Sequence, residues 1–242
     1  MNEEFGERIA VVVGSSGSIG RAIAAALRAE GYKVVGWQRL PELSPQLDYV
    51  QDVDLTSEDS IISATQETLK ISRRVDVLVY AAGKLKLAKI DNLEVADWDE
   101  MFSVNVRGLY LVCKHLVRAG EVRVVVPIGS VAAHVGADES FAYTASKGGN
   151  RSLAIALAQV YAPKTRVALV SPAWVDGGFT DQVRDGMEDK SRVEEVAKEV
   201  HLLQRMCTPA EVANTVVFVA SEKASFITGT EIMVDGGFMI KR

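Results

Sequence analysis

Tyr143 and Lys147 stand four residues apart in a segment with helical spacing, so both side chains project from one face of the helix over successive turns. This places a phenol beside an ammonium group. A free Tyr hydroxyl has a pKa of about 10 and exchanges protons poorly at neutral pH, but a fixed positive charge nearby favours its ionised form. The pair is therefore a candidate for proton transfer, although the same spacing also occurs on ordinary solvated helix faces.

A glycine-rich loop lies between the apolar run 9–13 and a segment with helical periodicity, 19–29. Glycines let the backbone turn tightly and approach a pyrophosphate, whose charge the N-terminus of a helix stabilises. In this strand, turn and helix context, the pattern favours a dinucleotide site over a purely structural turn. The candidate contacts in this loop are Gly14, Ser16, Gly17, Ser18, Ile19 and Gly20.

The end of the second apolar run bears on which dinucleotide is used. An acidic residue there would bind the ribose 2′-hydroxyl of NAD, whereas an Arg would accept the 2′-phosphate of NADP. The chain reads Gly36-Trp37-Gln38-Arg39, with no acid and one Arg. Arg39 therefore predicts NADP(H) as the favoured cofactor, with NAD(H) and a merely solvated Arg39 as the alternatives.

The elements that must position these residues alternate regularly along the chain. Apolar runs at 9–13, 33–37, 75–80, 122–128, 165–170 and 231–234 are separated by helical patterns near 19–29, 57–71, 97–118, 141–161 and 209–220. Such alternation predicts an α/β fold with right-handed crossovers. We expect one domain over 1–242, with a doubly wound, mostly parallel, seven-stranded sheet flanked by helices on both faces.

Two segments depart from this alternation. Between Trp37 and Tyr49, two prolines within a few residues predict a loop or one helical turn in place of a helix. Residues 176–206 begin with Asp-Gly-Gly-Phe-Thr and then become charged, which is typical of a hinged flap over a pocket. An ordinary charged surface excursion is the alternative for 176–206.

Composition excludes several classes of function. A formal charge of −5 with scattered basic residues argues against a nucleic-acid or anionic-membrane surface. Cys113 and Cys207 lie apart from any second thiol or His at metal-ligand spacing, so no metal site or disulfide is expected. No apolar run approaches the ~18 residues of a membrane span, and the acidic start lacks the pattern of a signal peptide. These features predict a cytoplasmic protein.

Taken together, the motifs resemble those of the short-chain dehydrogenase/reductase family, in its compact single-domain branch, over nearly the whole chain. The matching positions are Gly14, Gly17 and Gly20 of its coenzyme loop, Asp54 and Leu55 of its adenine-contacting pair, Ala81, Ala82 and Gly83 of its Asn-Asn-Ala-Gly segment, its helix residue Asn105, and Ser130, Tyr143 and Lys147 of its Ser and Tyr-x-x-x-Lys motifs. Segments 205–213 and 227–237 resemble C-terminal signatures of its 3-oxoacyl-carrier-protein-reductase-like members. The resemblance implies a Rossmann-like fold.

The resemblance also implies a reaction, the interconversion of a ketone and a secondary alcohol by hydride transfer. Tyr143 would donate the proton, Ser130 would orient the carbonyl oxygen, and Lys147 would hold the nicotinamide ribose and lower the pKa of Tyr143. Asn105 would hold a water in a proton relay to Lys147. The alternatives are an NAD-dependent alcohol dehydrogenase or epimerase of the same fold and, in another class, a dinucleotide-binding regulatory or scaffold protein.

Several positions depart from the family's pattern. Gly17 followed by Ser18 is a spacing closer to that of longer family members, and Tyr80 replaces an Asn of the sheet motif, which is expected to affect packing more than chemistry. Pro172 and Val175 belong to a segment that resembles the one beside the nicotinamide. Gly177 replaces its usual Thr, so Thr180 is the candidate substitute.

Substrate contacts and assembly are also predicted. The candidate substrate residues are His134, Trp174 and Phe179, with Trp174 expected as an apolar pocket wall. The expected substrate is a small carbonyl or alcohol. By resemblance, the chain would form a homo-oligomer, a tetramer or a dimer, through helices near 97–118 and 141–161 and the C-terminal strand.

Overall fold

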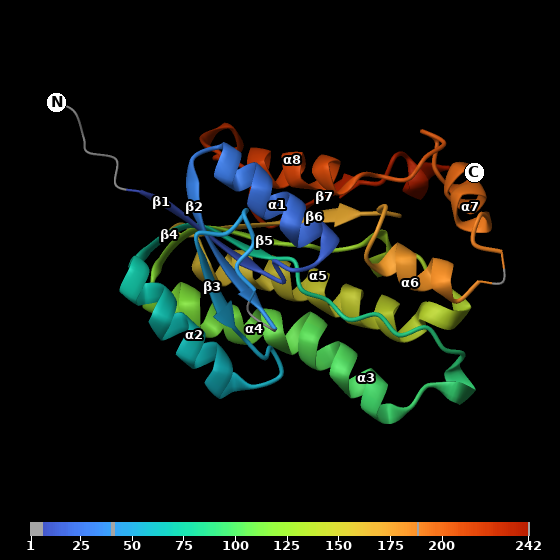
Figure 1. Cartoon of the computed structure of the whole chain (residues 1–242), viewed down its shortest axis with the longest axis horizontal. Helices are drawn as coiled ribbons and strands as arrows, with labels where there is room; N and C mark the ends of the chain where they lie inside the picture. The colour runs from blue at the N-terminus through green and yellow to red at the C-terminus, as the bar shows by residue number, and fades with distance from the viewer. Residues whose placement is uncertain (1–6, 40–41, 188, 242) are drawn as a thin grey trace.

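A computed structural model of the chain describes residues 7–39, 42–187 and 189–241, and within them all strands pair into one parallel sheet (Figure 1). The strand order is β3-β2-β1-β4-β5-β6-β7. The strands are β1 (Arg8–Val13), β2 (Tyr32–Gln38), β3 (Tyr49–Asp52), β4 (Arg74–Tyr80), β5 (Glu121–Pro127), β6 (Arg166–Pro172) and β7 (Thr230–Val234). This confirms the predicted doubly wound, seven-stranded sheet and shows that it is wholly parallel.

The central strands are apolar throughout because both faces of the sheet are covered. In β1, Ile9, Val11 and Val13 pack into one hydrophobic layer, whereas Ala10 and Val12 pack into the layer on the other side. Alternating side chains of a strand point to opposite faces, so a strand buried on both sides must be apolar at every position.

Helices form the two outer layers (Figure 1). One face is covered by α1 (Ser18–Ala29) and α8 (Pro209–Ala220), whose buried residues share one core with the sheet. The other face is covered by α2 (Glu58–Ile71), α4 (Leu109–Val112) and α5 (Phe141–Tyr161). Strands and helices alternate along the chain in the order that the sequence pattern predicted.

The long helical segment predicted near 97–118 is helical but not uniform. It begins as α3 (Val95–Phe102), widens into a π-helical segment at Ser103–Gly108, returns as α4 and widens again at Cys113–Val117. A π-helical turn leaves backbone carbonyls without their ordinary helical partner. The Tyr80 hydroxyl donates a hydrogen bond of 2.5 Å to the carbonyl of Val104 in the first of these wide turns.

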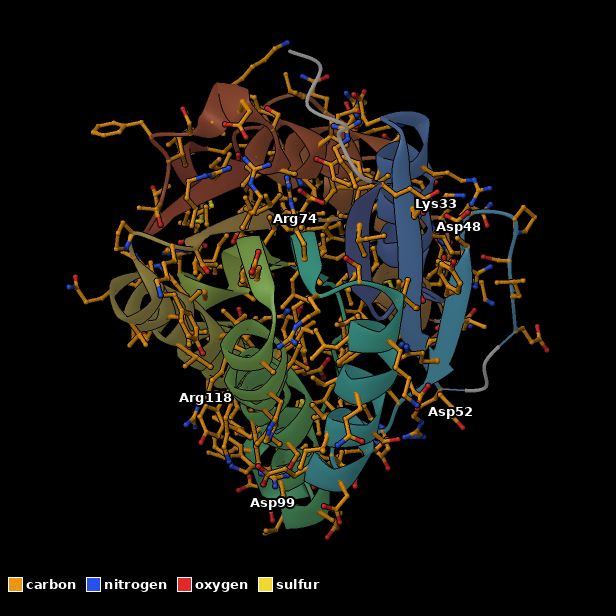
Figure 2. The ribbon with its side chains drawn as sticks, turned by 90° about the vertical axis from the view of Figure 1, so that its left-hand side faces the viewer. Lys33, Asp48, Asp52, Arg74, Asp99 and Arg118 are labelled. Atoms are coloured by element: carbon orange, nitrogen blue, oxygen red, sulfur yellow. The ribbon has the colours of Figure 1, made fainter. Side chains whose placement is uncertain are left out.

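Strand β3 is the short strand that hydrophobic periodicity did not identify. It pairs with the end of β2, from Val35 opposite Tyr49 to Gln38 opposite Asp52. Asp48 anchors its start, because the carboxylate accepts a hydrogen bond of 2.9 Å from the Val34 amide and lies 3.8 Å from the Lys33 ammonium (Figure 2). Such polar anchoring carries no periodic signal.

The connection before β3 contains no helix in its described part, residues 42–48, as its prolines predicted. Leu40 and Pro41 lie outside the described residues. The segment 176–206 contains two helices, α6 (Phe179–Asp185) and α7 (Arg192–Val200), which the Arg184 guanidinium links by a 2.9 Å hydrogen bond to Glu194. Among the residues described, no helix has the length and apolarity needed to cross a membrane.

Candidate active site

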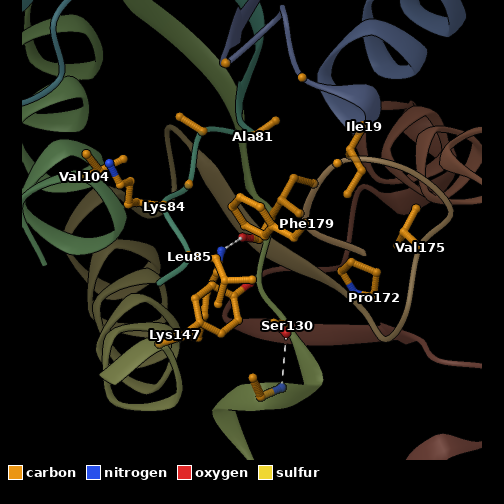
Figure 3. A pocket seen from close by; sticks show the side chains of 18 of the residues that line it. Ile19, Ala81, Lys84, Leu85, Val104, Ser130, Lys147, Pro172, Val175 and Phe179 are labelled. Atoms are coloured by element: carbon orange, nitrogen blue, oxygen red, sulfur yellow. Dashed lines mark hydrogen bonds between the residues drawn. The ribbon is translucent and has the colours of Figure 1, made fainter. Parts of the chain in front are cut away.

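A cavity of about 1040 Å³ opens at the carboxyl ends of the strands, where doubly wound sheets place their ligands (Figure 3). Its size lies at the upper end of ordinary ligand pockets, which suits a dinucleotide together with a small substrate. The predicted cofactor residues all line it: Gly14, Ser16, Gly17, Ser18, Ile19, Gly20, Arg39, Asp54, Leu55, Ala81, Ala82, Gly83, Tyr143, Lys147, Pro172 and Val175.

The glycine loop forms a tight cradle at one end of this cavity. Gly14 has a φ of +83°, and a Cβ there would lie 2.6 Å from the Ala82 nitrogen. A Cβ at Gly20 would lie 2.1 Å from the Gly14 oxygen, so this turn excludes side chains at both positions. Helix α1 begins after Gly17 with no capping side chain and no acid in its first turn. The free first-turn amides therefore fit a pyrophosphate.

Ser18 packs closely against two glycines at the start of segment 176–206, Gly177 and Gly178. A Cβ at Gly178 would lie 2.7 Å from the Ser18 Oγ atom, and one at Gly177 would lie 3.4 Å from the Ser18 Cβ atom. Both glycines also have positive φ values, +90° at Gly177 and +62° at Gly178. Ser18 and Gly177 thus pack closely, because Gly177 has no side chain. Thr180, which is 7% exposed, lies in the first turn of α6.

The end of β2 presents an amide and a guanidinium group to the cavity. Gln38 is buried, and its Oε1 atom accepts a hydrogen bond of 2.7 Å from the Ser15 hydroxyl. Arg39 is exposed at the cavity wall. On the next loop, hydrogen bonds from Thr56 and, more weakly, the charge of Arg39 hold the pKa of the Asp54 carboxyl below its usual value.

Ser130 lies just beyond the end of β5 and faces Tyr143. Its hydroxyl accepts a hydrogen bond of 3.1 Å from the Ala132 amide and so caps the short 3₁₀ turn Val131–Ala133. The side chain is nearly buried, at 9% exposure, and lines the cavity. It therefore has a fixed position and still reaches the space in front of the phenol.

Tyr143 and Lys147 project from α5 into the same part of the cavity, as their spacing predicted. Lys147 is 4% exposed, its ammonium donates a 3.0 Å hydrogen bond to the Ile128 carbonyl, and burial lowers its pKa to about 8. Burial raises the pKa of Tyr143 to about 12, against a smaller lowering by Ser130. The net shift is opposite to the lowering that the neighbouring ammonium was expected to cause, because loss of solvent is its largest cause. The Lys147 ammonium lies 5.7 Å from the ring centroid.

Aromatic and aliphatic side chains form the wall beside Tyr143. The Phe179 ring meets the Tyr143 ring edge to face, with centroids 5.9 Å apart, and also approaches Gly83 across the cavity. Leu85 lies near Phe179 (Figure 3), and Trp174 is also among the residues that line the cavity. The structure thus places Trp174 and Phe179 at the cavity, where the sequence predicted substrate contacts.

His134 does not line the cavity, contrary to the prediction. Its Nε2 atom lies 2.8 Å from the Glu231 carboxylate on β7. Ala132 and Val135 line the cavity, but His134 between them does not. A buried carboxylate binds the imidazole more strongly than an open pocket would, so the ring faces away from the cavity. The sequence could not indicate this pairing, because Glu231 is remote in sequence.

Asn105 lies behind the cavity wall and is fully buried. Its side chain accepts a 2.7 Å hydrogen bond from the Lys84 amide and donates one of 2.8 Å to the Ser146 hydroxyl. Its backbone carbonyl, in the π-helical segment, accepts a 2.8 Å hydrogen bond from the Asn150 side chain. The described contacts therefore make Asn105 a link between the Gly83–Lys84 segment and α5, and the predicted water relay is not tested by them.

Sequence reasoning missed two polar residues that hold this link, Ser146 and Asn150. Both are buried, and with Tyr143 and Lys147 they occupy positions i, i+3, i+4 and i+7 of α5. Polar residues on a helix stripe that ordinarily faces the core are a signal that could have identified them. Lys84, paired with Glu100 at 2.8 Å, carried no such signal.

Comparison with known proteins agrees with this geometry. A family model described as enoyl-(acyl carrier protein) reductase matches residues 13–239. The chain is 30% identical to D-threitol dehydrogenase of Mycolicibacterium smegmatis, over 97% of this chain and 94% of the relative, and 30% identical to cyclopentanol dehydrogenase of Comamonas, over 96% and 97%. A solved structure from Brucella melitensis, a short-chain dehydrogenase/reductase of the glucose/ribitol dehydrogenase type, superimposes with a TM-score of 0.89 at 31% identity, over the full length of both chains.

Proposed function

The chain belongs to the short-chain dehydrogenase/reductase family, and from this premise we propose that it reduces a small ketone to a secondary alcohol with NADPH. Membership makes it an oxidoreductase that acts on alcohols or ketones with a nicotinamide dinucleotide. The observation that carries the proposal is the meeting of Ser130, Tyr143 and Lys147 in the cavity that the glycine loop also lines.

Each of the three side chains has a distinct part in the proposed reaction. The nicotinamide, when bound, supplies the hydride. Ser130 donates a hydrogen bond to the substrate carbonyl oxygen and fixes its orientation, while Tyr143 donates the proton that this oxygen takes up. Lys147 holds a positive charge beside Tyr143, which stabilises the phenolate left after proton donation.

In the protein without ligands, Tyr143 is in the protonated form that carbonyl reduction uses. A phenol with a pKa of about 12 is protonated at neutral pH and is ready to donate. Oxidation of an alcohol would instead need the phenolate as base, and burial disfavours that form. The relatives' names favour the opposite direction, because D-threitol and cyclopentanol dehydrogenases are named for alcohol oxidation. Alcohol dehydrogenation with NAD(P) is therefore the second candidate function.

The proposed preference for NADP(H) is supported by the groups at the end of β2. Gln38 is neutral and tied to Ser15, so no carboxylate there repels a 2′-phosphate, and Arg39 lies at the wall to bind it. Replacing Arg39 with Glu should weaken NADPH binding about tenfold or more and leave NADH binding little changed. Titrations of both dinucleotides by fluorescence measure this, and an unchanged NADPH preference would overturn the assignment.

The proton-donor role of Tyr143 is tested by Tyr143→Phe. The variant keeps the ring against Phe179 but has no proton to give, so NADPH-dependent reduction should fall roughly 10²–10⁴-fold. NADPH oxidation is followed against a panel of cyclic ketones, keto-sugars, quinones and acyl thioesters. NADPH binding should stay near that of the wild type. Undiminished reduction in Tyr143→Phe would contradict the proposal.

A further inference from the structure

A buried carboxylate on the last strand joins four parts of the molecule. Glu231 of β7 has a side chain only 8% exposed, and its two oxygens accept three hydrogen bonds. Ser171 of β6 donates to Oε1 at 2.6 Å, Arg151 of α5 donates to Oε2 at 2.7 Å, and the His134 ring nitrogen lies 2.8 Å from Oε2. These are the charged and polar groups that face Glu231 from the elements packed against it.

Each partner of Glu231 leads directly to a residue of the active site. His134 ends the 3₁₀ turn that Ser130 caps, so its anchoring fixes the far end of that turn. Arg151 follows Lys147 by four residues and Tyr143 by eight, so all three share one stripe of α5. Glu231 thus connects the turn that carries Ser130 to the helix that carries the other two side chains.

Ser171 links Glu231 to the backbone that leads into Ser130. Its hydroxyl lies 2.1 Å from the position that a Cβ at Gly129 would take, so residue 129 must be Gly for the chain to pass so close. The Gly129 amide also donates to the Val170 carbonyl, which ties this corner to β6. The backbone immediately before Ser130 therefore rests on the hydroxyl that Glu231 holds.

The arrangement suits a rigid support. A buried carboxylate is stable only when its lone pairs are filled, and here three donors, two of them able to carry charge, fill them. Burial acts to raise the pKa of Glu231, but the hydrogen bonds from Ser171, Arg151 and His134 together lower it below its usual value. The carboxylate is therefore ionised at neutral pH and holds its donors in fixed directions.

We propose that Glu231 is a positioning residue, which holds the Ser130 turn and the Tyr143–Lys147 helix in register through His134, Arg151 and Ser171. It touches none of the reacting atoms. The proposal rests on the proposed function, because the position that it fixes matters only if Ser130 orients a carbonyl oxygen in front of Tyr143.

Glu231→Gln keeps the size of the side chain and removes the charge that binds Arg151 and His134. We expect kcat to fall about tenfold, with the affinity for NADPH within about twofold of that of the wild type, because the glycine loop is untouched. Ser171→Ala removes the support behind Gly129 without leaving a buried charge unpaired, and should show a smaller loss of the same kind. Ser171→Ala also tests the proposal if Glu231→Gln does not fold.

The chain offers a matched control in Glu58. Its carboxylate also binds one cation and one imidazole, Lys114 at 2.7 Å and His115 at 2.8 Å. Glu58 lies on α2 and both partners lie on the π-helical segment Cys113–Val117, and none of the three lines the cavity. Glu58→Gln should leave kcat unchanged. An equal loss of kcat in Glu58→Gln would show that the effect is one of general stability and would overturn the positioning role.

A double variant tests whether Glu231 affects kcat through the position of Ser130 or through another part of the site. If Glu231 acts by placing Ser130, Glu231→Gln should lower kcat by less than about twofold when Ser130 is already Ala. A full tenfold loss in the Ser130→Ala background would overturn the proposal.

Amide hydrogen exchange of the protein without ligands tests the same placement independently of turnover. The Ala132 amide, which is bound to the Ser130 hydroxyl, should exchange about tenfold faster in Glu231→Gln than in the wild type or Glu58→Gln. Unchanged protection of this turn would overturn the proposal. If the wild type reduces or oxidises nothing in the panel, the proposed function fails, whereas the exchange result still decides whether Glu231 holds the turn.

Discussion

At the scale of single residues, burial determines the proton chemistry more than neighbouring charge does. The ammonium of Lys147 was expected to lower the pKa of Tyr143, but both groups lie out of solvent, which disfavours the ionised form of each. The phenol therefore keeps its proton and the ammonium loses its own more easily. Tyr143 therefore has a proton to donate at neutral pH, and Lys147 supports the donation only while its ammonium stays charged.

The two pKa values predict how reduction depends on pH. Tyr143 is protonated below about 12 and Lys147 is charged below about 8, so both groups are in the active form only below about pH 8. Carbonyl reduction should be fully developed at pH 6–7 and fall as the pH rises through about 8, where Lys147 loses its charge. A profile of kcat/KM for NADPH-dependent reduction measures this. Activity that stays level up to pH 10 would contradict the role given to the Lys147 charge.

At the scale of elements, the π-helical segment Ser103–Gly108 shows how one strand residue shapes a helix. Tyr80 at the end of β4 is fully buried and binds the Val104 carbonyl, and a Cβ at Gly108 would lie 2.3 Å from its hydroxyl. The wide turn also presents the Asn105 carbonyl to Asn150. Tyr80 was expected to affect sheet packing more than chemistry, and its hydroxyl extends the packing effect to the segment that carries Asn105.

Tyr80→Phe should therefore destabilise the fold through this segment. The variant leaves the half-buried Val104 carbonyl without this partner, which costs about 1 kcal/mol of unfolding free energy. Urea unfolding followed by circular dichroism measures the change. Tyr110→Phe is the control, because Tyr110 lies on α4 with its ring 45% exposed and should change stability little. Equal stability of the two variants would show that the Tyr80 hydroxyl does not support the turn.

At the scale of the whole molecule, two of the groups of exposed apolar side chains lie at helices α5 and α8, away from the cavity. One is on α4 and α5 and includes Ile155 and Val160, the latter 69% exposed. The other lies beside α8 and β7 and includes Phe218 and the fully exposed Phe226. Exposed apolar groups of this kind are typical of surfaces that bind other chains. The first group lies on helices through which the sequence predicted self-assembly, whereas Phe218 lies on α8 and Phe226 in the loop before the C-terminal strand.

We therefore predict a tetramer, built through both groups. Light scattering should give a mass near four times the 26.2 kDa of one chain, and Val160→Asp or Phe226→Asp should reduce it by placing a charge in an interface. Ile90→Asp is the control, since Ile90 is 70% exposed but lies in the loop after β4. A wild-type mass close to that of one chain would contradict the prediction.

The fold and much of the candidate site were predictable because their signals are local. The apolar runs gave the central strands, the turn between β1 and α1 gave the glycine loop, and the i, i+4 spacing placed Tyr143 and Lys147 on one face of α5. Strand β3 was missed because a four-residue edge strand anchored by Asp48 has no periodic apolar pattern.

The sequence by itself determined the order of the main elements, the family and the glycine-loop and Tyr143–Lys147 parts of the cavity, since period and spacing along a chain are properties of neighbouring residues. Only the tertiary structure decided where His134 points, because its partner Glu231 lies 97 residues away. It also decided the direction of the Tyr143 pKa shift, because burial arises when distant segments pack together. Pairing and loss of solvent depend on the folded chain as a whole, and no local pattern encodes them.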